Sequence, residues 1–279
     1  MEAKIGFVSF AAGNRSVKLA GIRLKNQLLK SKIPAKIKIY GENDLATILA
    51  PDDEAFLSQN MCKRGFGFWI WKPLIIIDFL EKNPELDFLV YLDAGCEFHI
   101  SDQSLGNFYK YVEGAKLNQI CSFSTQNDQK YTKCWTLNYF QLNEQLILMP
   151  QIQSGILIFN SSAVNPICLD WIELMRVRNY ENLVDKRDKL LEHPEFIEHR
   201  HDQSILSMYL KSKNIGKIYP ASEHTWPHHL NDSLKMSPFW AVRNMSLVSV
   251  RYQHFWNPFY ILERFLFNLN SKFHDLQKN

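Results

Sequence analysis

The stretch Phe88-Leu89-Val90-Tyr91-Leu92-Asp93-Ala94-Gly95 decides the fold, because an apolar run stops there at an acid. An unbroken series of Val, Leu and Tyr is typical of a strand in the middle of a parallel sheet, where both faces are buried. Open α/β sheets bind ligands in the crevice at the carboxyl ends of their strands. We therefore expect residues 88–92 to form a central strand that delivers Asp93 to a ligand site.

Alternating strand and helix patterns surround this strand. Residues 4–10 and 35–40 are predicted strands, and apolar residues recur at helical spacing over residues 17–28. Residues 72–80 continue as a helix after Pro73, a residue that the first turn of a helix tolerates. Such alternation predicts an α/β fold of the Rossmann type, a sandwich whose mostly parallel central sheet is flanked by helices. Further along the chain we expect strands at residues 120–124 and 155–160, and helices at 163–176 and 201–212.

Length and composition indicate one large domain. The chain has 279 residues, of which 46% are hydrophobic, enough for a substantial core. No internal repeat, low-complexity tract or Gly/Ser linker marks a boundary, so residues 1–279 are predicted to be a single domain. The 32 basic and 29 acidic residues nearly balance, and this balance gives no reason to expect nucleic acid as a partner.

The cysteines and the ends of the chain indicate a cytoplasmic protein. Five cysteines, widely spaced and without a CxxC pair, argue against a disulfide framework and a structural zinc site. The first residues do not resemble a secretory leader, and no run approaches the roughly 20 apolar residues of a membrane-spanning helix. Residues 259–279 are predicted to be a packed C-terminal helix, with weak contact to the inner face of a membrane as the alternative.

Asp93 is the first candidate ligand-binding residue. At a strand end it would suit Mg²⁺ or Mn²⁺, which prefer oxygen ligands and commonly bridge a carboxylate to substrate phosphates. A turn or helix-cap role explains the same residue equally well. Glu97, four residues on, would either join the metal site or face solvent, and His254 is a more distant candidate for a second ligand.

Residues 64–73, Arg64-Gly65-Phe66-Gly67-Phe68-Trp69-Ile70-Trp71-Lys72-Pro73, combine cationic and aromatic side chains. Arg64 and Lys72 could hold a diphosphate by charge-assisted hydrogen bonds, and the two glycines would permit a tight backbone. The Trp and Phe residues are more typical of a core than of ligand stacking. The diphosphate interpretation requires that this segment lie near Asp93.

Two further segments place polar residues beside apolar patterns. The strand pattern that ends at Asn160 is preceded by Gln153, Ser154 and Gly155. These three residues would either let substrate hydroxyls approach the backbone or form an ordinary β-turn. Asp202 opens a helical pattern. It would either cap that helix or address a hydroxyl group, as general base or as hydrogen-bond acceptor.

Taken together, these elements resemble nucleotide-sugar-dependent glycosyltransferases of the GT-A type, particularly bacterial enzymes that build surface polysaccharides such as lipopolysaccharide and capsule. The resemblance spans most of residues 4–210. It is carried by the order of the β-loop-α pattern at residues 5–29, Arg64 with Trp69-Ile70-Trp71-Lys72-Pro73, Tyr91-Leu92-Asp93-Ala94-Gly95, Ser154-Gly155 before a strand ending in Asn160, and His201-Asp202-Gln203-Ser204.

The resemblance implies that a nucleotide-sugar donor is the co-substrate, bound by roughly residues 1–125. In that family an Asp-x-Asp motif holds a divalent ion, Mn²⁺ or Mg²⁺, on the donor diphosphate, so Asp93 would take that role. The chain departs from the pattern at Gly95, which has no side chain. Either Glu97 and His254 supply further ligands, or cations of the protein replace the ion. The implied donor-binding residues are Ala11, Gly13, Asn14, Asp44, Arg64, Trp69, Lys72, Asp93, Ala94 and Gly95.

The resemblance also implies that residues of about 126–258 bind the acceptor, a glycan or a lipid-linked glycan. The acceptor hydroxyl would attack the anomeric carbon while the ion or the cations stabilise the departing nucleoside diphosphate. Asp202 would be the catalytic base of an inverting enzyme, or would orient a sugar in a retaining one. The implied acceptor-binding residues are Gln153, Ser154, Gly155, His201, Asp202 and Gln203.

Other functions stay open at this point. A noncatalytic glycan- or nucleotide-binding protein would use the seven Trp and eleven Tyr as stacking surfaces. A nucleotidyltransferase or a metal-dependent phosphohydrolase also places an acid at a strand end, but it normally brings more acids or a phosphate loop, and residues 10–14 have neither. No GxSxG elbow, Walker A loop, HExxH or kinase motif set is present, which removes support for several common enzyme classes.

Overall fold

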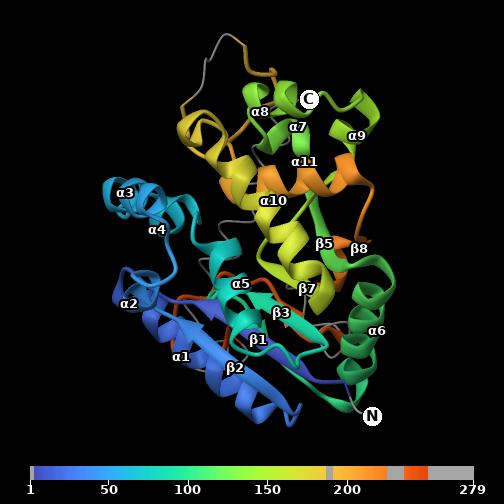
Figure 1. Ribbon diagram of the computed structural model, residues 1–279. Coiled ribbons are helices and arrows are strands. Elements are labelled where there is room, and N and C mark those ends of the chain that lie inside the picture. Colours follow the sequence, from blue (N-terminus) through green and yellow to red (C-terminus); the bar gives the residue numbers. More distant parts are fainter. Residues whose placement is uncertain (1–2, 187–190, 225–235, 251–279) are drawn as a thin grey trace, which may run out of the picture.

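The protein is described by a computed structural model that covers residues 3–186, 191–224 and 236–250. Its centre is a seven-stranded sheet with the order β2-β1-β3-β7-β5-β6, in which β8 also pairs with β5 (Figure 1). These strands are β1 (Ile5–Phe10), β2 (Ala35–Tyr40), β3 (Phe88–Leu92), β5 (Ile120–Asn127), β6 (Pro150–Ile152), β7 (Ile156–Asn160) and β8 (Lys217–Tyr219). Strands β4 (Glu97–Phe98) and β9 (Phe239–Trp240) form a second, two-stranded sheet.

Most strands of the large sheet run in one direction. β1 is parallel to β2 and β3, and β8 is parallel to β5. β7 is antiparallel to both β3 and β5, so β3 and β5 point the same way, while β6 is antiparallel to β5. The predicted fold class, an α/β sandwich with a mostly parallel central sheet flanked by helices, is confirmed.

Helices cover the sheet and connect its strands (Figure 1). The long ones are α1 (Arg15–Lys30), α3 (Pro51–Asn60), α5 (Lys72–Glu81), α6 (Asp102–Asn118), α10 (Ser161–Tyr180) and α11 (His201–Lys213). The short ones are α2 (Glu42–Leu45), α4 (Arg64–Phe68), α7 (Asp128–Tyr131), α8 (Cys134–Phe140), α9 (Glu144–Leu148) and the 3₁₀ turn η1 (Ala221–Glu223). Within the described ranges, no helix is long and apolar enough to cross a membrane.

Side chains that alternate along the central strands build an apolar core on each face of the sheet. On one face, Val8 and Tyr91 pack with residues of α5, α10 and α11. On the other face, Phe7 and Val90 pack with residues of α1 and α6. Because both faces are covered, β3 is apolar along its whole length, as predicted for residues 88–92.

The predicted strands and helices are present, with boundaries that differ by a few residues. The predicted C-terminal helix at residues 259–279 lies outside the described residues. Beyond β9 the chain returns to the first half of the molecule, where residues 241–250, here called the return segment, lie beside the turn that follows β3. Asn244 N–H donates a 2.8 Å hydrogen bond to the carbonyl oxygen of Gly95 in that turn.

Candidate functional site

A cleft of about 1090 Å³ opens where β1 and β3 end, and its walls come from distant parts of the chain. They include the loop after β1, the segment before α5, the turn after β3, the start of α11 and part of the return segment. Most residues predicted for the donor and the acceptor line it together. These are Gly13, Asn14, Arg64, Trp69, Lys72, Asp93, Ala94, Gly95, Gln153, Ser154, Gly155, His201, Asp202 and Gln203.

Asp93 follows β3 directly and faces this cleft. The phenol of Tyr91 donates a 2.6 Å hydrogen bond to its Oδ1. Burial and the charge of Asp93 raise the pKa of Tyr91, so the phenol keeps its proton. Gly155 lies so close that a Cβ atom there would come within 2.8 Å of Oδ2. The Asp93 side chain is still 39% exposed, so the protein orients the carboxylate without covering it.

The ammonium group of Lys72 lies buried in the cleft wall between two carboxylates. Its Nζ is 2.6 Å from Oδ2 of Asp202 and 3.4 Å from Oδ1 of Asp93, and the side chain is 1% exposed. It also donates hydrogen bonds to Oγ and the carbonyl oxygen of Ser154, at 3.1 and 3.3 Å. Burial opposes the charge, but the two carboxylates outweigh it and raise the pKa of Lys72. The ammonium group of Lys72 therefore stays protonated, and its hydrogen bonds are made with protein groups.

Asp202 lies in the first turn of α11, and its carboxylate joins this cluster instead of capping the helix. Oδ2 accepts a 2.7 Å hydrogen bond from the hydroxyl of Ser154, in addition to its ion pair with Lys72. Burial is the main influence on the carboxyl group and raises the pKa of Asp202 against the attraction of Lys72. A raised pKa favours a carboxylate that accepts a proton during a reaction.

Residues 65–69 form a left-handed turn at the edge of the cleft. All five residues have positive φ angles, from +51° to +84°. Glycine adopts this conformation freely, whereas each of the three aromatic residues pays about 1–2 kcal/mol for it. A Cβ atom at Gly65 would lie 2.0 Å from the ring of Trp69, and the indole N–H of Trp71 donates to the carbonyl oxygens of Gly65 and Phe66. Strain of this kind is concentrated at functional sites.

His201 and Gln203 stand at the start of α11 and bond mainly to protein groups. The Nδ1 atom of His201 lies 2.8 Å from the carbonyl oxygen of Leu183, and burial lowers the pKa of the ring. The side chain of Gln203 accepts a hydrogen bond from the N–H of Ser154 and donates one to Gln151. Both residues therefore shape the cleft wall.

Among the described residues, four buried polar atoms in the cleft lining have no hydrogen-bond partner. Two of them, Nε of Arg200 and Nε2 of His201, lie 3.5 and 3.6 Å from carboxylate oxygens. The other two, Nε2 of Gln153 and Nδ1 of His224, have no such acid beside them. The Nε2 atom of His224 donates to the carbonyl oxygen of Ser124 at 3.3 Å, and burial lowers the pKa of the ring, which leaves Nδ1 as an acceptor. The cleft thus offers a donor and an acceptor to a ligand. Buried polar groups without partners are costly, so they favour a polar ligand here.

Ala11 and Asp44, which were predicted to bind the donor, line a neighbouring cavity of about 460 Å³ instead of the main cleft. The carboxylate of Asp44 accepts 2.7 Å hydrogen bonds from Nζ of Lys38 and from the N–H of Gly41. His254, a predicted metal ligand, lies outside the described residues.

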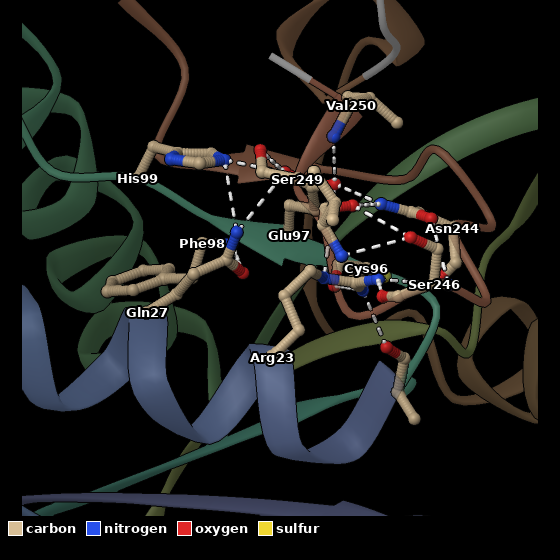
Figure 2. Close-up of polar contacts among 12 residues, drawn as sticks. Arg23, Gln27, Cys96, Glu97, Phe98, His99, Asn244, Ser246, Ser249 and Val250 are labelled. Carbon is tan, nitrogen blue, oxygen red and sulfur yellow. Dashed lines mark hydrogen bonds and ion pairs between the residues drawn. The ribbon is translucent and has the colours of Figure 1, made fainter. Parts of the chain in front are cut away.

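Glu97 does not line the cleft and lies in a buried cluster with residues of α1 and the return segment (Figure 2). Its Oε1 accepts from Nδ2 of Asn244 and the N–H of Val250, at 2.6 and 2.8 Å. Its Oε2 accepts from the hydroxyl of Ser249 and lies 2.9 Å from Nε2 of His99. Burial opposes the charge, but these hydrogen bonds outweigh it and lower the pKa of Glu97 to about 2. The metal role predicted for Glu97 does not agree with this geometry, because protein donors occupy both oxygens.

The described residues do not form a metal centre at Asp93. They contain no group of three or more His, Cys, Asp or Glu side chains arranged to hold an ion. Asp202 is paired with Lys72, and Gly95 contributes no side chain. The positive charge beside Asp93 is instead the ammonium group of Lys72, so the donor set differs from that of a protein-held divalent ion.

Two cations that line the cleft, Arg200 and Arg243, were not predicted from the sequence. Arg200 lines the cleft with its guanidinium group 3.5 Å from the ring centre of Tyr131, and Arg243 enters from the return segment. Arg64, which was predicted, is held by Glu198 at 2.7 Å. No local pattern marks Arg243, because only the fold brings residue 243 to the turn after β3.

Comparisons with known proteins include a distant structural likeness. No protein-family description and no curated protein sequence matches the chain. Among solved structures, it is similar to the apo form of mouse xyloside xylosyltransferase 1, with a TM-score of 0.46 and 12% identity, over 81% of this chain and 88% of that chain. A likeness this distant carries no argument about activity, which must come from the cleft.

Proposed function

We propose that this protein is a glycosyltransferase that moves a sugar from a nucleotide-diphosphate donor to a hydroxyl group of a glycan or lipid-linked glycan. The observation that carries the proposal is the exposed Asp93 carboxylate at the end of β3, oriented by Tyr91 and Gly155 in a cleft of about 1090 Å³. Such a volume suits a nucleotide sugar. The synthesis of bacterial surface polysaccharide is the setting that the sequence resemblance suggests.

In this proposal the donor lies along the turn after β3. The loop at Gly13 and Asn14 and the indole of Trp69 line the same cleft and would contact the nucleoside. During transfer the bond between the anomeric carbon and the phosphate oxygen breaks, and the nucleoside diphosphate leaves with the negative charge. Positive groups held in the site would stabilise that charge.

The acceptor would enter on the side of Gln153 and His224. Their unpartnered Nε2 and Nδ1 atoms offer one donor and one acceptor, a combination that suits sugar hydroxyl groups. The attacking hydroxyl forms the new bond to the anomeric carbon and gives its proton to Asp202, whose pKa is raised by burial. Asp202, Ser154 and Lys72 form one hydrogen-bonded unit, so proton acceptance there would be coupled to the ammonium charge.

A donor screen with an Asp93→Ala variant tests the proposal. The intact chain is mixed with UDP-, GDP-, CMP- and dTDP-sugars, with Mn²⁺, with Mg²⁺ or with EDTA, and both the melting temperature and nucleotide release are measured. We expect one donor class to stabilise the protein and to release its nucleotide. Asp93→Ala should abolish release while the chain stays folded, because it removes the exposed carboxylate at the strand end.

Asp52→Ala, an exposed acid on α3 outside the cleft lining, is the matched control and should keep full turnover. Undiminished turnover in Asp93→Ala would contradict the proposed site. Stabilisation by a sugar nucleotide without release of product would indicate a noncatalytic binding protein. If no donor stabilises the wild-type chain or reacts with it, the glycosyltransferase proposal is wrong.

A further inference from the structure

Gly95 stands where an Asp-x-Asp motif has its second acid, and the return segment occupies the space that a side chain would need. A Cβ atom at Gly95 would lie 3.1 Å from Cα of Arg243 and 3.2 Å from Cε of Met245. The backbone of Asn244 also bonds to the carbonyl oxygen of Gly95 at 2.8 Å. The glycine thus permits a second part of the chain to pack directly on the turn after Asp93.

The buried guanidinium group of Arg23, on α1, ties these two parts together (Figure 2). Its Nη1 donates to the carbonyl oxygens of Asn244 and Ser246, both at 2.6 Å. Its Nη2 donates to the carbonyl oxygens of Ala94 and Cys96, at 3.0 and 2.9 Å. One side chain therefore forms charge-assisted hydrogen bonds with the turn after β3 and with the return segment at the same time.

Glu97 is the second buried charge of this clamp. Its carboxylate receives hydrogen bonds from Asn244, Ser249 and Val250, and it lies 3.9 Å from Nε of Arg23 (Figure 2). Before the return segment, Trp240 of β9 pairs with Glu97 of β4. The chain is thus fixed on both sides of Arg243, by strand pairing at residue 240 and by the clamp from residue 244 onward.

Arg243 is held in an unfavourable conformation at the cleft. Its φ angle is +50°, which costs a residue with a side chain about 1–2 kcal/mol, and the surrounding clamp maintains it. The side chain is exposed and lines the cleft. Burial lowers the pKa of neighbouring Arg200, and the charge of Arg243 acts in the same direction.

Three other cations of the cleft are engaged by acids, and Arg200 is one of them, with its Nε 3.5 Å from Glu198. A fourth, Lys63, lies on the segment before α4 and not on the one that packs on the Asp93 turn. Lys72 is enclosed by two carboxylates and Ser154, and Arg64 is paired with Glu198. In the part of the chain that the structure describes, Arg243 makes no ion pair with an acid. It is the cation beside the Asp93 turn that remains available to an anionic ligand.

We propose that Arg243 binds the diphosphate of the donor, and that the Arg23–Glu97 clamp and Gly95 serve to place it there. This rests on the proposed function, which supplies the nucleotide-diphosphate donor. A guanidinium group matches two phosphate oxygens at once and stays charged at all physiological pH values. At this position it would neutralise charge on the leaving nucleoside diphosphate, beside the turn where the sequence lacks a second acid.

Calorimetric titration with nucleoside diphosphates tests the assignment. UDP, GDP, ADP and dTDP are titrated into the wild-type chain and into Arg243→Ala, with the corresponding nucleosides as ligands that lack phosphate. Arg243→Ala should weaken binding of the preferred diphosphate about tenfold or more, since it removes charge-assisted hydrogen bonds, and should leave nucleoside affinity unchanged. Arg243→Lys should recover part of the loss, because the charge returns without the planar fork.

Arg178→Ala is the matched control. Arg178 is also exposed and also has a left-handed backbone conformation, with φ of +47°. It lies beside Trp135, outside the cleft lining. This variant should bind the diphosphate as the wild-type chain does. The melting temperature of each variant is measured alongside, so that a general loss of folding is recognised.

Gly95→Ala tests how Arg243 is placed. The added methyl group would press on the backbone of Arg243 and displace it, so this variant should also weaken diphosphate binding. If Gly95→Ala weakens diphosphate binding by displacing Arg243, the further change Arg243→Ala should cost little affinity in the Gly95→Ala variant. In the wild-type chain the same change should cost much more.

Three results would overturn the inference. Equal diphosphate affinity in wild type and Arg243→Ala would remove the role of Arg243 while leaving the proposed function intact. Equal losses for nucleoside and diphosphate would show that Arg243 only supports the shape of the cleft. A wild-type chain that binds none of the diphosphates would overturn the inference together with the proposed function.

Discussion

Two acids four residues apart, Asp93 and Glu97, belong to separate charge clusters, one before and one after the same turn, and the clusters differ in how far their carboxylates are exposed. Around Asp93, the cationic Lys72 is enclosed while the carboxylate itself stays 39% exposed to the cleft. Around Glu97, both carboxylate oxygens are taken up by protein donors, and the side chain is fully buried.

Asp93 is therefore a carboxylate that can bind a ligand, whereas Glu97 is a carboxylate whose hydrogen bonds fix a segment of backbone. A buried charge needs hydrogen bonds and an opposite charge to offset its desolvation. Glu97 obtains them entirely within the protein, so it serves to hold the return segment. Asp93 obtains only part of them from Tyr91 and Lys72, which leaves its carboxylate able to interact with a ligand.

The largest effect is expected from Lys72→Met, which removes the cation of the Asp93 cluster. Asp202 would then be buried without its partner, and loss of one member of a buried ion pair costs about 3–5 kcal/mol of unfolding free energy. Urea denaturation measures this cost, and the donor assay should show no nucleotide release. Adding Asp202→Asn to Lys72→Met should restore part of the stability, because the carboxylate that remains without its cation, Asp93, is partly exposed and the buried one is gone.

Lys82→Met is the control for this experiment, since Lys82 pairs with Asp78 near the end of α5 and is 62% exposed. It should change the unfolding free energy by less than about 0.5 kcal/mol. If Lys72→Met behaves like Lys82→Met, the cluster around Asp93 does not depend on a buried charge, and the contrast with Glu97 disappears.

The next effect concerns Asp202→Asn. This change removes the proposed base and keeps the shape of the side chain, so sugar transfer should fall about 10²–10⁴-fold. Affinity for the nucleoside diphosphate should stay within about threefold, because the donor contacts lie elsewhere in the cleft. Transfer rates and calorimetric titration check both parts.

Asp170→Asn, on α10 outside the cleft lining, is the comparison for Asp202→Asn and should transfer sugar normally. If Asp202→Asn instead loses donor binding and keeps the transfer rate of bound substrate, Asp202 belongs to the donor side. Its assignment as base would then be withdrawn.

The smallest effect is expected from Glu97→Gln and should depend on pH. The folded-state pKa of Glu97 is about 2, below its ordinary value of 4.5, so its charge stabilises the fold above about pH 4.5. That contribution, about 3 kcal/mol from the size of the shift, is lost as pH falls from about 4.5 toward 2. The wild-type chain should therefore exceed Glu97→Gln in unfolding free energy at pH 7, and the two should converge in acid.

Glu113→Gln, an exposed acid on α6, is the control and should follow the wild-type curve throughout. A difference between wild type and Glu97→Gln that stays constant from pH 7 to pH 2 would show that the charge of Glu97 does not hold the return segment.

Much of the scaffold was predictable from sequence because its causes are local. The apolar run at residues 88–92 predicted β3, since a strand buried on both faces needs apolar side chains at every position. The same run placed Asp93 at a carboxyl end of the sheet. The small and polar residues around Ser154 predicted either an approach of substrate hydroxyls or an ordinary turn before the strand. These predictions required only neighbouring residues.

The roles of the charged residues were less predictable. Lys72 was expected to bind a diphosphate, but its hydrogen bonds go to residues 93, 154 and 202. Glu97 was expected near the metal, but its oxygens face residues 244–250. Arg243 was not anticipated, because residues 23, 95 and 97 hold it and none of them is near it in sequence.

The sequence by itself determined the α/β sheet, the position of Asp93 at the end of β3 and the set of polar segments that would surround a cleft. The tertiary structure alone decided which of those charges are enclosed and which face the cleft. The physical reason is that hydrophobic periodicity acts between near neighbours, whereas the state of a charge depends on burial and on partners. Here those partners lie more than a hundred residues away, as for Lys72 with Asp202 and Arg23 with Asn244.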